Sequence, residues 1–489
     1  MGKFYITTSI PYVNSNPHIG FGMELVQADI LARYHRQLGD KVLFSTGTDE
    51  HGGKMAEKAA EFKQTPQQFV DQMSQAFRGI LPLLDISNDR FIRTTDPAHE
   101  QRAQLIWKNL AKFIYKGTYS GWYCTGHEEY FPESVVKENK GICPDHNRPY
   151  EQLKEDNYFF KLSAFGKQVQ AAIEDGTFQI IPETRRNEIL SLIKGGLEDI
   201  SVSRPKDKIA WGIPVPDDET QVMYVWFEAL MNYITVLGYP EHQDFKTFWP
   251  ADVQVIGKDI LRFHAAIWPA MLIGLGLALP KKLYVHGHIV VAQKKMSKTL
   301  GNVVAPKEIV DKYGTDTFRY FFLRHIPSYS DGDFSWDRLE RAYNDELADQ
   351  LGNAVSRTAA MITQYQNGLV GDIPPPDHDI SQFQEAIAAC HFDRALDEVW
   401  EQVKGLNQYI DETKPWEIAK TKDETHLQEV LAYMASCLLE IADMLRPFMP
   451  QTADKIRSAF GEGVLRPLSG PLFPKKEKPS NARPATSSV

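Results

Sequence analysis

The stretch SIPYVNSNPHIGFG, residues 9–22, decides how this chain folds. The β-branched and aromatic residues 3–8 before it predict a buried strand. A helix is predicted after it, because apolar residues recur at three- and four-residue spacing: Leu25, Val26, Ile30, Leu31, Tyr34 and Leu38. A strand, a turn with His18 and Gly20, and a helix N-terminus can together hold phosphate, because backbone N–H groups and the helix dipole both favour an anion there. A His-x-Gly at a helix start is, taken alone, more often a capping turn.

A second motif, KMSKT at residues 295–299, lies more than 270 residues downstream on a short polar loop. Together PHIGF and KMSKT resemble the two signature motifs of the class I aminoacyl-tRNA synthetases, which activate an amino acid with ATP. The resemblance runs from about Lys3 to about Pro450 and is closest to the methionine-specific branch of that family. It implies an ATP site that contains His18, Gly20, Phe21, Lys295 and Lys298. Phe21 departs from the family, which usually has histidine or asparagine there, so more of the phosphate binding falls on His18 and the two lysines.

The composition is that of an ordinary globular protein, with 489 residues, 43% of them hydrophobic and 24% charged. The formal charge of −10 does not suggest a nucleic-acid partner, so a bound tRNA would need local basic patches. Four cysteines in so long a chain do not make a disulfide framework and indicate a reducing cytoplasm. We expect no signal peptide. The most apolar run, residues 263–279, is interrupted by His264 and Pro269 and predicts a buried helix, not a membrane span.

A second strand that ends in a glycine-containing polar loop is predicted within residues 41–52. Two more are predicted near residues 254–257 and 283–286, each followed by a glycine-containing turn. Ligands of parallel α/β sheets bind at the carboxyl ends of the strands, so Asp49 is placed to meet a cation. The resemblance implies that Asp49 pairs with the α-ammonium group of methionine; a helix N-cap is the alternative. It also implies that Gly257 and Asp259 contact adenosine and that His286 belongs to the ATP site.

The segment MYVWFEALMNY, residues 223–233, predicts a helix with an aromatic stripe. Such a stripe is usually part of the core. The resemblance instead implies that it faces the methionine thioether, which packs well against aromatic rings. The methionine site implied in this way consists of Asp49 with Ile10, Tyr12, Trp226, Ala229, Leu230, Tyr233 and His264.

Residues 116–225 interrupt the α/β pattern and contain two Cys-x-x-His pairs, Cys124 with His127 and Cys143 with His146. Two close pairs of sulfur and nitrogen ligands suit a tetrahedral, structural Zn²⁺ site. The spacing matches the zinc knuckle of the family's connective insertion, although cysteine is more common where His127 stands. Two unrelated Cys-x-x-His pairs are the alternative. The insertion is too short for the large editing domain of the isoleucine, valine and leucine enzymes.

The chain becomes helical after Arg338, with three apolar stripes that predict a helical bundle. The stripes contain Leu347, Leu351, Val355, Thr358 and Ile362; Phe392, Leu396, Val399, Val403, Leu406 and Ile410; and Leu427, Val430, Met434, Cys437, Ile441 and Leu445. Asn353 and Arg357 are four residues apart and point away from the first stripe. Trp416 follows Pro415 at a predicted helix start. The strings NAVSR and KPW match the family's anticodon-binding positions, so the resemblance implies that Asn353, Arg357 and Trp416 read the anticodon; a solvated face and a core tryptophan are the alternative.

The predicted fold is α/β: a Rossmann-like parallel-sheet catalytic domain with a zinc-knuckle insertion, followed by an α-helical anticodon-binding bundle. The expected divisions are residues 1–115 and 226–290 for the catalytic domain, 116–225 for the insertion, 291–345 for the KMSKS loop and connecting region, 346–473 for the bundle, and 474–489 for a disordered tail.

The resemblance implies a cytoplasmic, monomeric methionine–tRNA ligase that uses ATP with Mg²⁺, methionine and tRNA(Met), holds one Zn²⁺ and binds no membrane. The monomer is expected because no C-terminal dimerisation module follows the bundle. Two alternatives remain at this point: a class I synthetase for another amino acid such as cysteine or leucine, and a non-catalytic tRNA-binding paralogue, for which Phe21 is the one hint.

Overall fold

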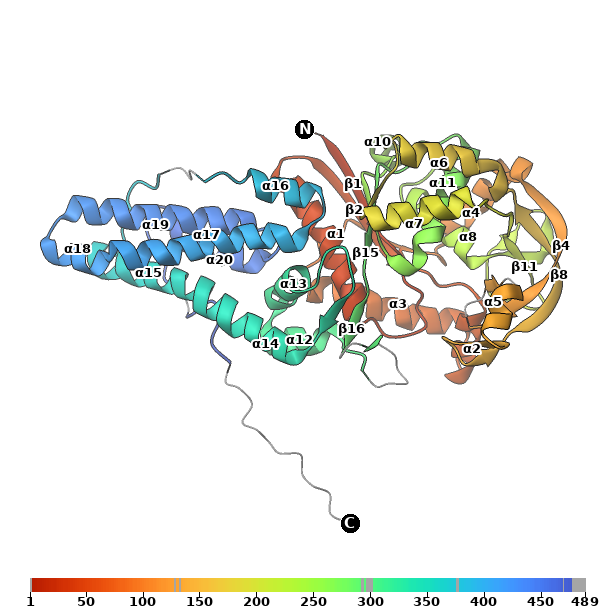
Figure 1. The fold of residues 1–489 in the computed structure, drawn as a ribbon, viewed down its shortest axis with the longest axis horizontal. Helices are drawn as coiled ribbons and strands as arrows, with labels where there is room; N and C mark the ends of the chain where they lie inside the picture. Colours follow the sequence, from red (N-terminus) through yellow and green to blue (C-terminus); the bar gives the residue numbers. More distant parts are fainter. Residues whose placement is uncertain are drawn as a thin grey trace, which may run out of the picture. The chain divides into compact units, whose positions relative to one another are not determined.

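The structure, a computed structural model, describes residues 2–126, 129–131, 133–291, 294–295, 302–374, 378–468 and 470–476; it places only the backbone of residues 119, 120, 129, 130, 153, 294 and 295. The chain forms two compact units, Met1–His286 and Gly287–Val489, each with its own architecture (Figure 1).

A six-stranded parallel sheet with the order β3-β2-β1-β14-β15-β9 forms the centre of the first unit. Its strands are β1 (Lys3–Thr8), β2 (Lys41–Thr48), β3 (Arg90–Arg93), β9 (Gln179–Ile181), β14 (Val253–Gly257) and β15 (Lys282–His286). Thr7 of β1 lies between Ser45 of β2 and Gln254 of β14 in the register. The central strands are buried on both faces, as parallel strands covered by helices must be. The predicted α/β fold is confirmed, and so are the strands expected at residues 3–8, within 41–52, and near 254–257 and 283–286.

Helix α1 (Ile19–Gln37) follows β1 and packs against β1, β2 and β14. Leu25, Val26, Ile30 and Leu31 are buried, which confirms the predicted apolar face. Leu38 does not continue that face: its side chain is 57% exposed, because the helix has ended at Gln37 and Leu38 is its C-cap. The other helices of this unit are α2 (Gly53–Glu61), α3 (Pro66–Leu83), α4 (Pro97–Asn109), α5 (Glu133–Glu138), α6 (Gly166–Glu174), α7 (Glu183–Lys194), α8 (Val225–Ala229), α9 (Asn232–Thr235), α10 (Gln243–Phe248) and α11 (Trp268–Leu275).

Antiparallel strands form three small sheets within the segment predicted as an insertion. They form a four-stranded sheet, β10-β8-β4-β5, a three-stranded sheet, β11-β13-β12, and the hairpin β6-β7. Their bounds are β4 (Ile114–Cys124), β5 (Glu129–Phe131), β6 (Ile142–Cys143), β7 (Arg148–Pro149), β8 (Glu151–Phe160), β10 (Ile200–Ser201), β11 (Ser203–Pro205), β12 (Pro214–Val215) and β13 (Asp218–Met223).

Part of the predicted insertion, residues 116–225, belongs to the main parallel sheet. Strand β9 lies inside that range and pairs in parallel with β15, so it is the edge strand of the main sheet. Sequence periodicity could not reveal this, because a strand of three residues is too short to show alternation.

Two segments predicted as single helices are divided in the structure. Residues 223–233 form the end of β13 and the short helices α8 and α9, and both sides of this segment are largely buried. Residues 263–275 form a π-helical turn, Phe263–Ile267, followed by α11, which ends where Gly276 takes a left-handed conformation. Residues 264–272 of this apolar run are buried, as predicted, whereas Gly276 and Ala278, beyond the end of the helix, are exposed. Among the residues that the structure describes, no helix is both long and apolar enough to cross a membrane.

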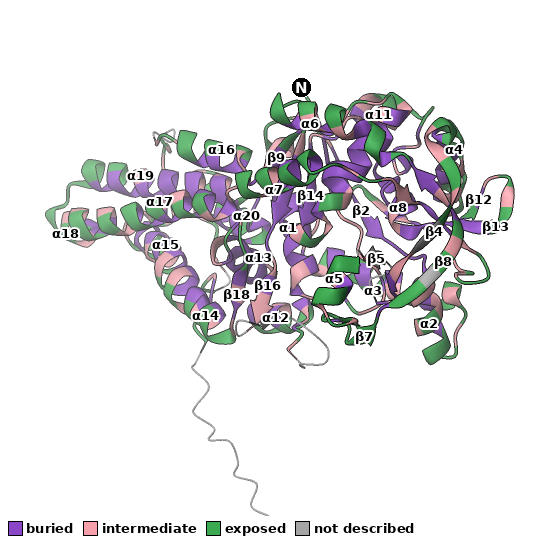
Figure 2. Cartoon of the chain, turned by 45° about the vertical axis from the view of Figure 1, so that its right-hand side comes forward, coloured by how far each residue is buried: buried purple, intermediate pink, exposed green. Residues whose placement is uncertain are grey.

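The second unit begins with a small sheet of β16 (Ile289–Val291), β17 (Lys294–Lys295) and β18 (Gly332–Phe334) and is otherwise helical. Buried and exposed stretches alternate along its long helices (Figure 2). All residues of the three predicted stripes are buried, which confirms the helical bundle. The helices are α12 (Pro306–Tyr313), α13 (Thr315–Arg324), α14 (Trp336–Arg341), a π-helical segment (Ala342–Gly352), α15 (Asn353–Gln366), α16 (Ser381–Ala388), α17 (Phe392–Thr413), α18 (Pro415–Thr421), α19 (Glu424–Leu445) and α20 (Pro450–Phe460).

Candidate active site

The predicted site residues of the first unit follow the carboxyl ends of four neighbouring strands. His18 lies after β1, Asp49 directly after β2, Asp259 after β14, and His286 is the last residue of β15. Because these strands are parallel and adjacent, their carboxyl ends share one edge of the sheet. This edge is where open α/β sheets bind their ligands.

His18 is the N-cap of α1. Its Nδ1 atom accepts a hydrogen bond from the backbone N–H of Gly20 at 3.0 Å. An accepting Nδ1 leaves the proton of a neutral imidazole on Nε2, so this cap prepares Nε2 as a donor. The first turn of α1 also supplies N–H groups and the positive end of the helix dipole. His18 and the start of α1 can therefore bind a phosphate group.

Phe21 belongs to the core. Its side chain is buried and lies edge-on to Phe77 of α3, with 5.2 Å between ring centroids. A phenyl ring has no hydrogen-bond donor, so any contribution of Phe21 to ATP binding is through the position of α1.

Asp49 joins the loops that follow β1 and β2. Its backbone N–H donates to the carbonyl of Pro11 at 2.9 Å, and its own carbonyl accepts from Val13 at 3.2 Å, which makes a short parallel bridge with Tyr12. Asp49 is 2% exposed. A buried carboxylate beside the half-buried Ile10 and Tyr12 of the β1 loop is a suitable partner for an ammonium group.

Tyr233 and His264 form a buried hydrogen-bonded pair. The Tyr233 hydroxyl lies 2.7 Å from Nε2 of His264, and Nδ1 of His264 lies 3.0 Å from the carbonyl of Ile260. A carbonyl only accepts, so Nδ1 carries the proton and Nε2 accepts from the tyrosine. Burial lowers the pKa of His264 to about 4 and raises the pKa of Tyr233. Both side chains are therefore neutral at pH 7.

Apolar groups surround this pair. Ala229 and Leu230 are buried, and the half-buried indole of Trp226 stacks on Phe263 with 4.3 Å between ring centroids. Tyr5 of β1 donates its hydroxyl to the carbonyl of Tyr233 at 2.8 Å and so ties the α9 helix to the sheet. A neutral, aromatic wall of this kind favours an uncharged and polarisable side chain.

Glu24 is a site residue that sequence reasoning missed. Its carboxylate accepts from the backbone N–H and the hydroxyl of Ser9, at 2.8 and 2.6 Å, and lies 2.9 Å from Nε2 of His286. It therefore joins β1, α1 and the end of β15. The sequence does contain a sign of this role. Glu24 stands on the side of α1 that the apolar periodicity assigns to the core, where a carboxylate needs a partner.

Gly257 and Asp259 form a tight turn after β14. A Cβ atom on Gly257 would lie 2.8 Å from a carboxylate oxygen of Asp259, so glycine leaves that carboxylate room in its present position. The side chain of Asp259 is exposed. The backbone of Lys295 is part of β17 in the second unit. The side chain of Lys295 and the whole of Lys298 lie outside the part of the chain that the structure describes.

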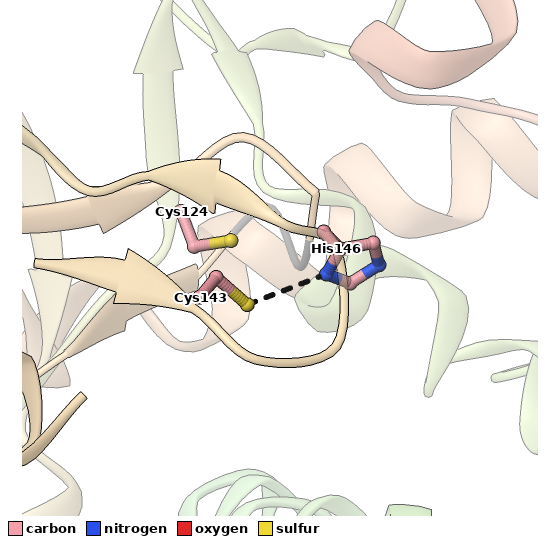
Figure 3. Close-up of side chains that lie close together, drawn as sticks. All are labelled: Cys124, Cys143 and His146. Atoms are coloured by element: carbon pink, nitrogen blue, oxygen red, sulfur yellow. Dashed lines mark hydrogen bonds between the residues drawn. The ribbon is translucent and has the colours of Figure 1, made fainter. Parts of the chain in front are cut away.

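Three of the four predicted zinc ligands lie together in the antiparallel region (Figure 3). The ligand atoms of Cys124, Cys143 and His146 are all within 4.8 Å of one another, and Sγ of Cys143 lies 3.6 Å from Nδ1 of His146. Gly126 permits this approach, because a Cβ there would lie 2.3 Å from the His146 ring. Two thiols and an imidazole are a donor set that Zn²⁺ prefers. His127 lies outside the described residues.

The predicted anticodon residues are on α15 and α18. Asn353 is exposed, and Arg357, one turn further along α15, is half-buried. Arg357 forms a 2.7 Å ion pair with Asp411 and lies over the ring of Trp416, which is also half-buried, with Cζ 5.9 Å from the ring centroid. Trp416 follows Pro415 at the start of α18, as predicted.

Comparison with known proteins identifies the family. A family model described as "tRNA synthetases class I (M)" matches residues 4–152 and 145–359, and one described as "Anticodon-binding domain of tRNA ligase" matches residues 377–481. The methionine–tRNA ligase of Caldanaerobacter subterraneus subsp. tengcongensis is 45% identical over 94% of this chain and 74% of its own length. That of Brucella melitensis biotype 1 is 39% identical over 97% of this chain and 98% of its own length.

A solved structure gives the same result. Mycobacterium tuberculosis methionyl-tRNA synthetase, in complex with methionyl-adenylate, superposes with a TM-score of 0.90 at 33% identity and covers 97% of this chain and 100% of that one. Over nearly its whole length, this chain is therefore similar to methionyl-tRNA synthetases both in sequence and in fold. The chain belongs to the methionyl-tRNA synthetase family of class I tRNA synthetases.

Proposed function

We infer that this chain is a methionine–tRNA ligase. The observation that carries the inference is its similarity, over 94–97% of its length, to methionine–tRNA ligases and to a synthetase solved with methionyl-adenylate. The reaction has two steps. A carboxylate oxygen of methionine attacks the α-phosphorus of ATP, the bond to the β-phosphate oxygen breaks, and methionyl-adenylate and pyrophosphate form. A ribose hydroxyl at the 3′ end of tRNA then attacks the acyl carbon, and AMP leaves.

The residues at the edge of the parallel sheet support a mechanism based on positioning and charge stabilisation. Asp49 would hold the α-ammonium group of methionine, while Ile10, Tyr12, Trp226 and the buried Tyr233–His264 pair would enclose its side chain. His18, with Nε2 as donor, and the N-terminus of α1 would stabilise the negative charge that develops on the phosphates. A covalent intermediate with the enzyme is not needed.

The adenosine and polyphosphate would be held by residues assigned from the family motifs. Gly257 would let the nucleotide approach the backbone, and Asp259 would accept from ribose hydroxyls. His286, bonded to Glu24, completes this side of the ATP site. Lys295 and Lys298 would bind the polyphosphate, and Mg²⁺ would accompany ATP and offset its charge.

The Cys124, Cys143 and His146 group would hold one structural Zn²⁺, with His127 as the fourth ligand. The ion would stabilise the antiparallel region and take no part in the chemistry. Asn353, Arg357 and Trp416 would contact the anticodon. The cytoplasmic location and the monomeric state stay predictions from the sequence.

Amino-acid-dependent ATP–pyrophosphate exchange, measured with each of the twenty amino acids, tests this function. We expect exchange with methionine, and charging of tRNA(Met) transcripts with methionine. Exchange with cysteine or leucine alone would identify a synthetase of different specificity. A folded protein that binds tRNA without any exchange would be a non-catalytic paralogue.

A further inference from the structure

Glu228 lies at the centre of a buried polar cluster that the mechanism above does not use. It belongs to α8 and is fully buried. One carboxylate oxygen lies 2.9 Å from Nδ1 of His51, and the other lies 2.9 Å from Nε2 of His99. His99, on α4, is in turn bonded to the hydroxyl of Thr235 on α9 at 2.8 Å. Every one of these residues is at most 3% exposed.

The cluster joins the two parts of the proposed methionine site. His51 stands two residues after Asp49, which would bind the α-ammonium group. Glu228 shares the five-residue helix α8 with Trp226 and Ala229, which would enclose the side chain. Glu228 and His51 are 177 residues apart in the sequence. Their hydrogen bond connects the end of β2 to α8, which carries the aromatic wall of the site.

The charges in the cluster make this connection strong. Burial disfavours a charge on His51, but the carboxylates of Glu228, Glu100 and Asp49 outweigh it and raise the pKa of His51 to about 10. Burial likewise opposes the charge on Glu228, and its two histidines overcome that effect and lower its pKa. A buried carboxylate between ring nitrogens makes charge-assisted hydrogen bonds, which hold geometry more tightly than neutral ones.

We propose that Glu228 is a positioning residue of the methionine site: through His51 it sets the distance between Asp49 and the wall formed by α8 and α9. The proposal rests on the proposed function. Displacement of a binding group by as little as about 1 Å can cost much of its effect, so a loose cluster weakens methionine binding first. ATP would contact other residues, so its binding depends little on Glu228.

Exchange kinetics of the whole protein test the proposal. Glu228→Gln keeps the shape and removes the charge, and we expect the KM for methionine to rise about tenfold while the KM for ATP stays within about twofold. Asp29→Asn is the matched control: Asp29 is also a fully buried carboxylate, but it binds Arg33 and Ser87 away from the methionine site. We expect this control to leave the KM for methionine unchanged.

A double-mutant cycle tests the route through His51. If Glu228 acts through that residue, His51→Gln raises the KM for methionine by a similar factor, and the double variant raises it no further than either single one. An unchanged KM for methionine, equal rises for methionine and ATP, or multiplying effects in the double variant would each overturn the proposal. If Glu228→Gln does not fold, the KM values of His51→Gln decide: a rise for methionine alone supports the proposal, and no rise, or equal rises for methionine and ATP, overturns it. A wild-type protein without methionine-dependent exchange would instead reject the proposed function itself.

Discussion

The guanidinium group of Arg357 on α15 lies over the indole ring of Trp416 on α18, with 5.9 Å between Cζ and the ring centroid. This distance is within the range of a cation–π interaction. The same guanidinium forms a 2.7 Å ion pair with Asp411 at the end of α17. One arginine thus contacts a half-buried aromatic ring and lies one helical turn from the exposed Asn353. An exposed ring face and a polar side chain are groups on which an unpaired base can stack and form hydrogen bonds.

Replacement of Trp416 by alanine should impair tRNA charging and leave amino-acid activation intact. Loss of a stacking platform removes about 1–3 kcal/mol per base. We therefore expect aminoacylation to fall through the tRNA KM or kcat, while ATP–pyrophosphate exchange, which needs no tRNA, stays near normal. Trp336→Ala, which removes another partly exposed tryptophan at a helix start, is the control. If both activities of Trp416→Ala fall together, Trp416 supports the fold and does not read the anticodon.

Lys298→Ala should slow adenylate formation by about a hundredfold or more, because a lysine that faces developing phosphoryl charge acts mainly in the transition state and is worth about 3 kcal/mol. The affinity for methionine should change little. Single-turnover formation of methionyl-adenylate and equilibrium binding of methionine measure the two quantities separately. An unaltered rate, or an equal loss of methionine affinity, would contradict the assignment.

The purified protein should contain one tightly bound Zn²⁺ per chain. Elemental analysis of the wild type and of Cys124→Ser measures this directly. Loss of the ion should destabilise the antiparallel region around β4 and β8 more than the methionine site, because the ligands stand outside that site. Cys437→Ser, at a buried cysteine of α19, should keep the zinc. A zinc-free wild type whose stability is unaffected by Cys124→Ser would rule the site out.

His264 should make the protein less stable in acid. Its pKa is about 4 when folded and 6.5 in the unfolded reference, so between these values the unfolded chain binds a proton that the folded protein does not. Stability therefore rises with pH through this window, and acidification from pH 6.5 to 4 costs about 3 kcal/mol from this group. His264→Gln, whose amide can replace both hydrogen bonds, should remove this part of the pH dependence in urea unfolding. An identical acid slope in the variant would refute the prediction.

His51 should make the protein less stable at alkaline pH. Its pKa is about 10 when folded and 6.5 in the unfolded reference, so its stabilising charge is fully present below pH 6.5. As the pH rises from 6.5 to 10 this stabilisation is lost, by about 5 kcal/mol at most. His51→Gln should flatten the alkaline side of the stability profile and leave the acid side unchanged. A variant that keeps the wild-type alkaline slope would show that another group causes it.

Local patterns in the sequence determined the type and position of most elements. Strand β1 and the apolar faces of α15, α17 and α19 follow from residue type and periodicity, since each depends on neighbours within a few turns of the chain. The PHIGF, KMSKT and Cys-x-x-His motifs identified the family because their residues stand at short, fixed spacings. Where a pattern spans few residues, as in β9, or where packing divides a helix, as between α8 and α9, prediction from the sequence failed.

Contacts between distant segments were decided only by the tertiary structure. Glu24 meets His286 across 262 residues, and Glu228 meets His51 across 177. Nothing near any of these positions indicates a partner, because the partner is brought there by the order of the strands in the sheet. The charge state of each buried group follows from that partner: His51 is surrounded by carboxylates and holds its proton, whereas His264 lies between a carbonyl and a tyrosine hydroxyl and stays neutral. The sequence supplied two histidines, and the folded environment gave them opposite charge states.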